Sequence, residues 1–186
     1  IHIRNYTEAP FYHCHIYFNL PEITEEIIDD INAKLDQLYP NKNVSNNEEI
    51  PKIESIITAF DDYDFLLLPH GGQSHATFNG SIPEGAGFDD TLMRNVYYNQ
   101  FDGFTARGDK GLQRTQNYFI RLGINEFVNL ITCTDNYNPN LYPDSRSKDA
   151  GPFIPTWMLA KATFQGLRLS LPHCQGKALW MMPRMP

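Results

Sequence analysis

Four histidines stand where the chain could bind a metal ion. The stretch FLLLPHGGQSH, from Phe65 to His75, ends an apolar strand at His70 and continues through two glycines to the second histidine. Upstream, HCHIYFN places His13 and His15 two residues apart, so both side chains share one face of a strand. Neutral imidazole is the commonest metal ligand in proteins. The pattern therefore predicts a metal site with His70, His15 and His75 as candidate ligands.

Each of these histidines also has a plainer interpretation. His70 follows a proline and precedes two glycines, so it fits a polar turn residue that is hydrogen-bonded to backbone. His75 lies in a segment rich in glycine and serine. His13 and His15 fit a solvated face of a strand. Residue spacing leaves both interpretations open.

One acid and two arginines supply further candidates. Asp135 closely follows the apolar stretch FVNLIT, where a carboxylate can bind a divalent cation or orient a water molecule. It also fits a turn in which its side chain bonds the following backbone. Arg107 and Arg114 can hold a phosphate, although surface ion pairs are the commoner role of arginine. These alternatives also remain open.

The composition limits the class of protein. A length of 186 residues suits one domain with a sizeable core, and 41% hydrophobic with 13% aromatic residues argue against disorder. The formal net charge of −7 disfavours general electrostatic binding to nucleic acid, but it leaves room for a local basic pocket. The three cysteines have no regular spacing, and the chain carries neither a secretory signal nor an apolar run of about 18 residues. We therefore expect a cytoplasmic protein without a membrane span.

Strand and helix patterns alternate along the chain. Alternating or continuous apolar residues predict strands at 13–19, 65–68, 103–106 and 127–132. Apolar residues three and four apart predict helices at 22–38, 50–60, 89–98, 112–122 and 163–171. This order is typical of an α/β fold with a parallel sheet, whose active sites collect at the carboxyl ends of the strands. We expect His70, Arg107 and Asp135 to gather there.

A family resemblance rests on two segments, CTDNYNPNLYPDS and PTWMLAKATFQGLRLSL. Together they resemble the polymerase-and-histidinol-phosphatase (PHP) domain of the group fused to or paired with large bacterial ATPases, some of which are implicated in phage defence. The second segment is the specific part of the likeness. Its matching residues are Thr156, Trp157, Met158, Ala160, Thr163, Phe164, Gly166, Leu167 and Arg168. The likeness covers residues 1–171, and the tail 172–186 resembles nothing that we can name.

The resemblance implies a fold and an activity. PHP domains are distorted seven-stranded (β/α)7 barrels. The opening HxHxxxS motif is not present, so either this chain starts after the motif and lacks the N-terminal part of the barrel, or it is a family member without the motif. They hydrolyse phosphoesters with divalent metal such as Mn, Zn or Mg. The resemblance also implies a nucleic-acid or nucleotide substrate and an ATPase domain or subunit as partner.

The same likeness assigns roles to individual residues. His70 and Asp135 fall at metal-ligand positions, and Arg107 would steady the charge on the phosphate. Arg114 and Tyr137 are candidate substrate-binding residues. Tyr137 stands where the pattern has a histidine, which predicts weak metal binding. The alternative is a catalytically degenerate PHP-like domain with a ligand-binding or structural role.

Overall fold

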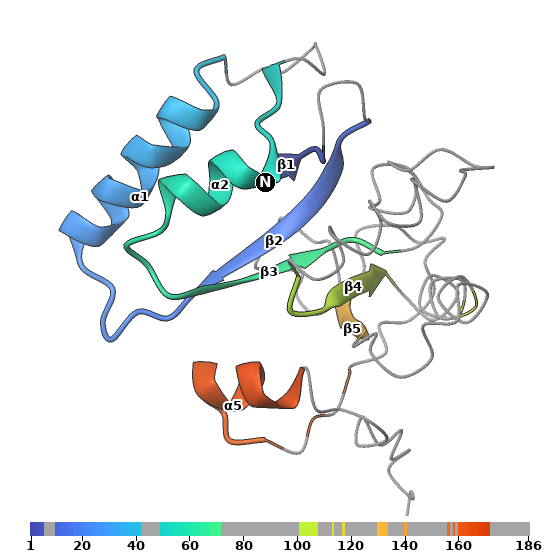
Figure 1. Cartoon of the computed structure of the whole chain (residues 1–186). Coiled ribbons are helices and arrows are strands. Elements are labelled where there is room, and N and C mark those ends of the chain that lie inside the picture. The colour runs from blue at the N-terminus through green and yellow to red at the C-terminus, as the bar shows by residue number, and fades with distance from the viewer. Residues whose placement is uncertain are drawn as a thin grey trace, which may run out of the picture.

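The computed structural model of the chain describes part of the sequence, coloured in Figure 1. The described residues are 1–5, 10–41, 49–71, 101–107, 113, 117, 130–133, 140, 156, 158 and 160–171. Their helices and strands are, in chain order, β1 (His2–Ile3), β2 (Tyr12–Phe18), α1 (Glu25–Leu38), α2 (Ile53–Ala59), β3 (Phe65–Pro69), β4 (Phe104–Arg107), β5 (Leu130–Cys133) and α5 (Phe164–Ser170). No helix in this part of the chain is both long and apolar enough to cross a membrane.

The first three strands form an antiparallel sheet in the order β1-β2-β3. Strands β4 and β5 pair in parallel. A parallel bridge joins His70 to Thr105, and the Gly71 N–H donates to the Thr105 carbonyl over 2.9 Å, so β4 runs beside the end of β3. The parallel arrangement expected of the strands at 13–19 and 65–68 is therefore wrong, and β1 is a strand that the sequence patterns did not predict. The seven-stranded barrel stays a prediction.

The connection between β2 and β3 explains their antiparallel pairing. A single helix after a strand returns the chain to the starting edge of the sheet, which gives a parallel neighbour. Here two helices intervene: α1 leads away from the end of β2, and α2 leads back toward it (Figure 1). Strand β3 therefore starts where β2 ends. Hydrogen bonds from the backbone and side chain of Asn19 to Asp64 close this end of the pair.

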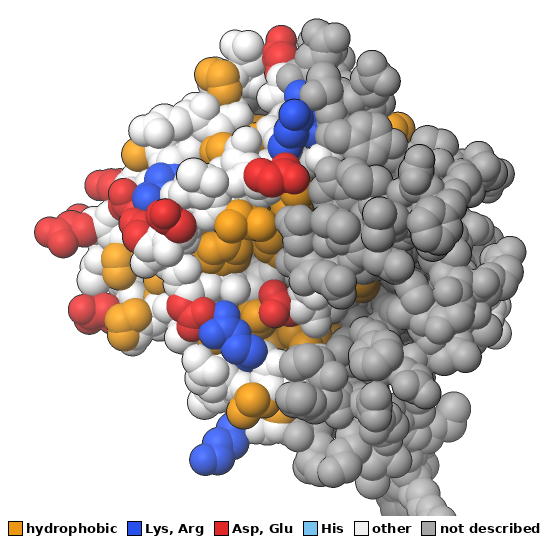
Figure 2. Space-filling model, viewed as in Figure 1, with side chains coloured by type: hydrophobic (Ala, Val, Ile, Leu, Met, Phe, Trp, Pro, Cys, Tyr) orange, Lys and Arg blue, Asp and Glu red, His pale blue; other side chains and the backbone are white. Residues whose placement is uncertain are grey.

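Helix α1 begins later than its apolar spacing predicts. Thr24 adopts an extended backbone, and its hydroxyl accepts from the Ile27 N–H over 3.3 Å, so the helix starts at Glu25. Glu25 and Glu26 in the first turn complement the helix dipole. No residue of α1 is fully buried; Ile31, Leu35 and Leu38 are partly buried against the core, whereas Ile28 is exposed. Acidic side chains gather on the outer surface of this part of the molecule (Figure 2).

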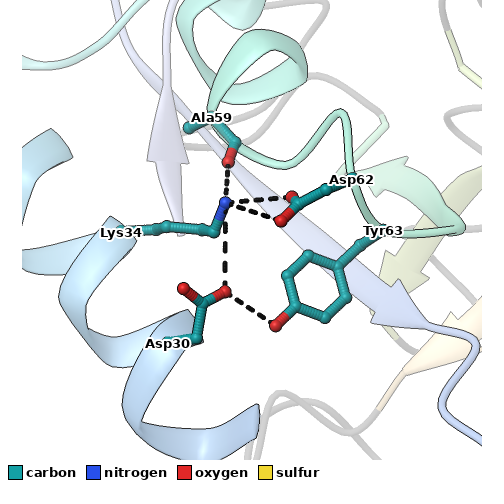
Figure 3. Close-up of polar contacts among 5 residues, drawn as sticks. All are labelled: Asp30, Lys34, Ala59, Asp62 and Tyr63. Atoms are coloured by element: carbon teal, nitrogen blue, oxygen red, sulfur yellow. Dashed lines mark hydrogen bonds and ion pairs between the residues drawn. The ribbon is translucent and has the colours of Figure 1, made fainter.

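A network of polar contacts ties α1 to the turn after α2 (Figure 3). The Lys34 ammonium donates to the Ala59 carbonyl over 3.0 Å and to an Asp62 carboxylate oxygen over 2.9 Å. The Tyr63 hydroxyl donates to Asp30 over 2.7 Å, and this bond raises the pKa of Tyr63 to about 12. Since α1 buries little apolar surface, these contacts help to fix its position.

The main core lies between the sheet and helices α1 and α2. Its fully buried members come from β1, β2, α2, β3 and β4: Ile3, Tyr12, Cys14, Ile53, Ile56, Phe60, Leu67 and Phe104. Strand β3 is buried on both faces, as its continuous apolar sequence predicts. Leu67 belongs to this core, whereas Leu66 and Leu68 point the other way and pack with Leu171.

Helix α5 packs against that second face of the sheet. Phe164 and Leu167 pack against the cluster of Leu66, Leu68 and Leu171 and so anchor the segment. Phe164 is only half-buried. Trp157, which matches the family pattern in the same segment, lies outside the described residues.

Residues 155–171, which carry the family resemblance, are called the family-like segment, and several of them have a structural role around α5. The Thr163 hydroxyl accepts from the Gly166 N–H over 3.0 Å and begins the helix. A Cβ at Gly166 would come within 2.1 Å of the Lys161 carbonyl oxygen, so only glycine fits there. Arg168 pairs with Asp64 and also donates to the Phe65 carbonyl, and this pairing lowers the pKa of Asp64.

Candidate functional site

Three neighbouring strands place histidines side by side across the sheet. In the register of β1 and β2, His2 is the partner of His13, and their rings stack with centroids 4.4 Å apart. On the next strand, Cys14 pairs with Pro69, which sets His70 beside His13. The His70 N–H donates to the His13 carbonyl over 2.9 Å, and the two ring centroids lie 5.3 Å apart.

A fourth histidine completes the group. His15 lies two residues beyond His13 on the same face of β2, and its ring centroid is 5.0 Å from that of His70. The Nε2 atoms of these two rings are 2.9 Å apart, which is hydrogen-bonding distance. In such a bond one nitrogen donates and the other accepts, so at least one ring is neutral. We call His2, His13, His70 and His15 the histidine row.

Aromatic side chains continue the row at both ends. The Phe11 ring lies 4.9 Å from His2, and the Tyr17 ring lies 6.0 Å from His15 in a nearly parallel orientation. His13, His15, Tyr17 and His70 are half-buried, while His2 is exposed. The row is therefore exposed to solvent at its β1 end. At its other end, Tyr17 packs against the cluster of Leu66, Leu68 and Leu171, which we call the second hydrophobic cluster.

The polar ends of β4 and β5 lie on the same edge of the sheet as His70. Thr105, buried in β4, is the bridge partner of His70, and its hydroxyl lies 3.4 Å from the Pro69 carbonyl. Arg107 ends β4 and pairs through its backbone with Cys133, the last residue of β5. Because β3, β4 and β5 pair in parallel, their carboxyl ends lie at the same edge of the sheet. The backbones of His70, Arg107 and Cys133 are at these ends.

Two residues outside the strands hold β4 and β5 in this arrangement. Asp102, just before β4, accepts from the Leu67 N–H over 3.3 Å, and burial raises the pKa of its carboxyl. The Thr156 hydroxyl accepts from the Thr132 N–H over 2.8 Å. Thr156 belongs to the family-like segment, so that segment fixes β5 as well as α5.

Several predicted site residues lie outside the described residues. These are His75, Arg114, Asp135 and Tyr137, together with the side chain of Arg107. The convergence of His70, Arg107 and Asp135 on one pocket thus stays a prediction. The structure brings together His15 and His70. Within the described ranges, no three or more histidine, cysteine, aspartate or glutamate side chains form a group that could hold a metal ion.

No pattern in the sequence indicated that His2 belongs to this group. Its register with His13 depends on how β1 pairs with β2, and neither strand encodes its partner locally. His13 and His15 are half-buried among other rings, so their face of β2 is partly covered and partly open to solvent. The available signal was the pair of histidines two residues apart, which correctly placed both side chains on one face.

Comparison with known proteins gives no match: no family model, no curated protein and no solved structure is significantly similar to this chain.

Proposed function

We propose that this chain is a metal-dependent phosphoesterase module of the PHP kind. The observation that carries the proposal is the 2.9 Å separation of the His15 and His70 Nε2 atoms, which come from adjacent strands. Two imidazole nitrogens this close can bind the same divalent cation when neither Nε2 atom carries a proton. Their half-buried setting restricts access of bulk water to such a cation.

The donor set suits the metals that the family resemblance implies. Imidazole binds Zn well, and a carboxylate at Asp135 would add the oxygen ligand that Mn and Mg favour. A bound divalent cation supplies Lewis-acid stabilisation of charge on a phosphoester. The Arg107 guanidinium would add positive charge at the same edge.

The wider setting of the proposal comes from the resemblance. The substrate would be a nucleic acid or nucleotide, and the partner an ATPase domain or subunit. The three cysteines are compatible with a reducing, cytoplasmic location. None of these statements is needed for the histidine pair to bind metal.

Removal of either paired histidine tests the proposal. His15→Ala and His70→Ala should each lower the Mn²⁺ or Zn²⁺ retained after dialysis by at least tenfold, because one imidazole holds such ions weakly. Hydrolysis of bis(p-nitrophenyl) phosphate should fall in parallel. His2→Asn is the matched control, because His2 lies at the far end of the histidine row. Equal metal content in all four proteins would refute the proposal.

A catalytically degenerate PHP-like domain is the second candidate. It is favoured by Tyr137, which stands where the family pattern has a histidine, because neutral tyrosine is a poor ligand near pH 7. Wild-type chain that binds less than one equivalent of Mn²⁺ and lacks phosphodiesterase activity would favour this candidate. Tyr137→His should then raise metal affinity. An active wild type that holds metal stoichiometrically would exclude it.

A further inference from the structure

A cavity lies beside the Tyr17 end of the histidine row. Its volume is about 550 Å³, and it is open to solvent. Strand β2 and the segment that leads into α5 border it, and the described residues that line it include Tyr17, Ala160, Lys161, Ala162, Phe164 and Leu167. Cavities of about 300–1,000 Å³ with mostly apolar walls and few polar groups are typical of small-molecule sites.

The aromatic walls of this cavity are fixed in place. The Arg168 guanidinium carbon lies 4.9 Å from the centroid of the Phe164 ring, and the same guanidinium is held by Asp64 and the Phe65 carbonyl. Tyr17 stacks on His15 and also packs against the second hydrophobic cluster. An aromatic ligand therefore meets rings that are already oriented, which lowers the entropic cost of binding.

One cation is part of the lining. Lys161 is exposed, and its backbone carbonyl lies close to Gly166 in the first turn of α5. Among the described residues, no carboxylate lines the cavity. In a chain with a net charge of −7, an aromatic cavity with a lysine and no acid favours a ligand that combines a flat ring with negative charge.

We infer that this cavity binds a nucleotide, with the base between the Tyr17 and Phe164 walls and the phosphate near Lys161. Bases stack on aromatic side chains with a gain of about 1–3 kcal/mol each. Tyr17 lines the cavity, and its ring stacks on that of His15. A bound nucleotide therefore lies next to the His15 and His70 pair. The inference names a nucleotide as the substrate of the proposed phosphoesterase and, for this role, rests on the proposed function. Binding of the nucleotide to the cavity needs no metal.

The test measures binding of AMP to the full chain by isothermal titration in EDTA. Adenosine lacks the phosphate and ribose 5-phosphate lacks the base, so the two separate the contributions. We expect AMP to bind at least tenfold more tightly than ribose 5-phosphate. Ala162→Trp, which fills the cavity from an exposed position, should weaken AMP at least tenfold. Ala160→Trp repeats the test from a second exposed position.

Lys161→Gln should weaken AMP about threefold and leave adenosine unchanged, since an exposed ion pair contributes little. Lys52→Gln is its control, because Lys52 is also exposed but does not line the cavity. Thermal melts establish that each variant is folded. Failure of AMP to bind, equal affinity for ribose 5-phosphate, or unchanged affinity in both folded tryptophan variants would overturn the inference.

The same experiment distinguishes this inference from the proposed function. His70→Ala should lose metal and hydrolysis but keep AMP affinity within about twofold of wild type, because His70 is not part of the cavity lining. AMP binding without any metal-dependent hydrolysis would retain the nucleotide site and reject the phosphoesterase. Hydrolysis that is unaffected by filling the cavity would reject the site as the place of substrate recognition.

Discussion

The two faces of β2 are made from alternate residues of one short strand, yet they differ in almost every physical property. Tyr12 and Cys14 point to the helix side and are 0% and 2% exposed. His13, His15 and Tyr17 point to the other side and stay half-buried among rings. The helix face is an apolar core, whereas the histidine face offers nitrogen atoms at hydrogen-bonding distance.

The elements that cover each face account for this difference. Helices α1 and α2 seal one face with isoleucines and phenylalanine, and they turn acidic side chains outward (Figure 2). Helix α5 covers only the Leu66 and Leu68 part of the other face. A phosphate-bearing ligand would be repelled by the acidic outer surface of α1, so the histidine face is the better place for the proposed chemistry.

The largest expected effect comes from opening the helix face. Phe60 is fully buried, and its ring packs edge-on against Phe18. Phe60→Ala should lower the free energy of unfolding by about 3–5 kcal/mol, measured by urea denaturation. His13→Ala on the opposite face should cost under about 1.5 kcal/mol. Equal losses would mean that the two faces do not differ in their contribution to stability.

A smaller loss should follow from a methyl group at the start of α5. Gly166→Ala puts a Cβ against the Lys161 carbonyl, and the shift needed to relieve this contact should cost about 1–3 kcal/mol. Gln165→Ala, at an exposed position of the same helix, is the control and should change stability by less than about 0.5 kcal/mol. A Gly166→Ala protein that unfolds at the wild-type urea concentration would contradict the close contact.

Alkaline pH should weaken the helix face through Cys14. Burial raises the pKa of this thiol from 9.0 to about 12. Between these values the unfolded thiol ionises while the folded one keeps its proton, so the free energy of unfolding falls as pH rises. The slope from one such group approaches about 1.4 kcal/mol per pH unit. Cys14→Ala should show a shallower fall between pH 9 and 11, with a remainder from Tyr39, whose pKa burial also raises.

The smallest effect is expected at the polar network outside the helix face. Lys34→Gln removes the contacts to Ala59 and Asp62 at the surface, where water and salt screen charges. We expect a slight decrease in melting temperature at low salt and a still smaller one in 1 M NaCl. A loss as large as that of Phe60→Ala would show that α1 depends on these contacts more than on its apolar side.

Local patterns predicted most of the described elements from the sequence. The spacing of isoleucines marked α1 and α2, and the run of leucines marked β3 as a strand buried on both faces. Errors at the ends had local causes as well, since the cap at Thr24 delays the start of α1. The alternation in HCHIYFN also placed His13 and His15 on one face.

The sequence by itself therefore determined most of the described helices and strands, though not β1, and which side chains of β2 share a face, because these depend on neighbours a few residues away. Only the tertiary structure decided that β2 and β3 pair directly and run antiparallel, since this depends on how the two predicted helices pack between them. It also decided that His2, His13 and His70 stand in one row and that His15 touches His70. Contacts between residues 55 positions apart follow from strand register, which the sheet fixes as a whole.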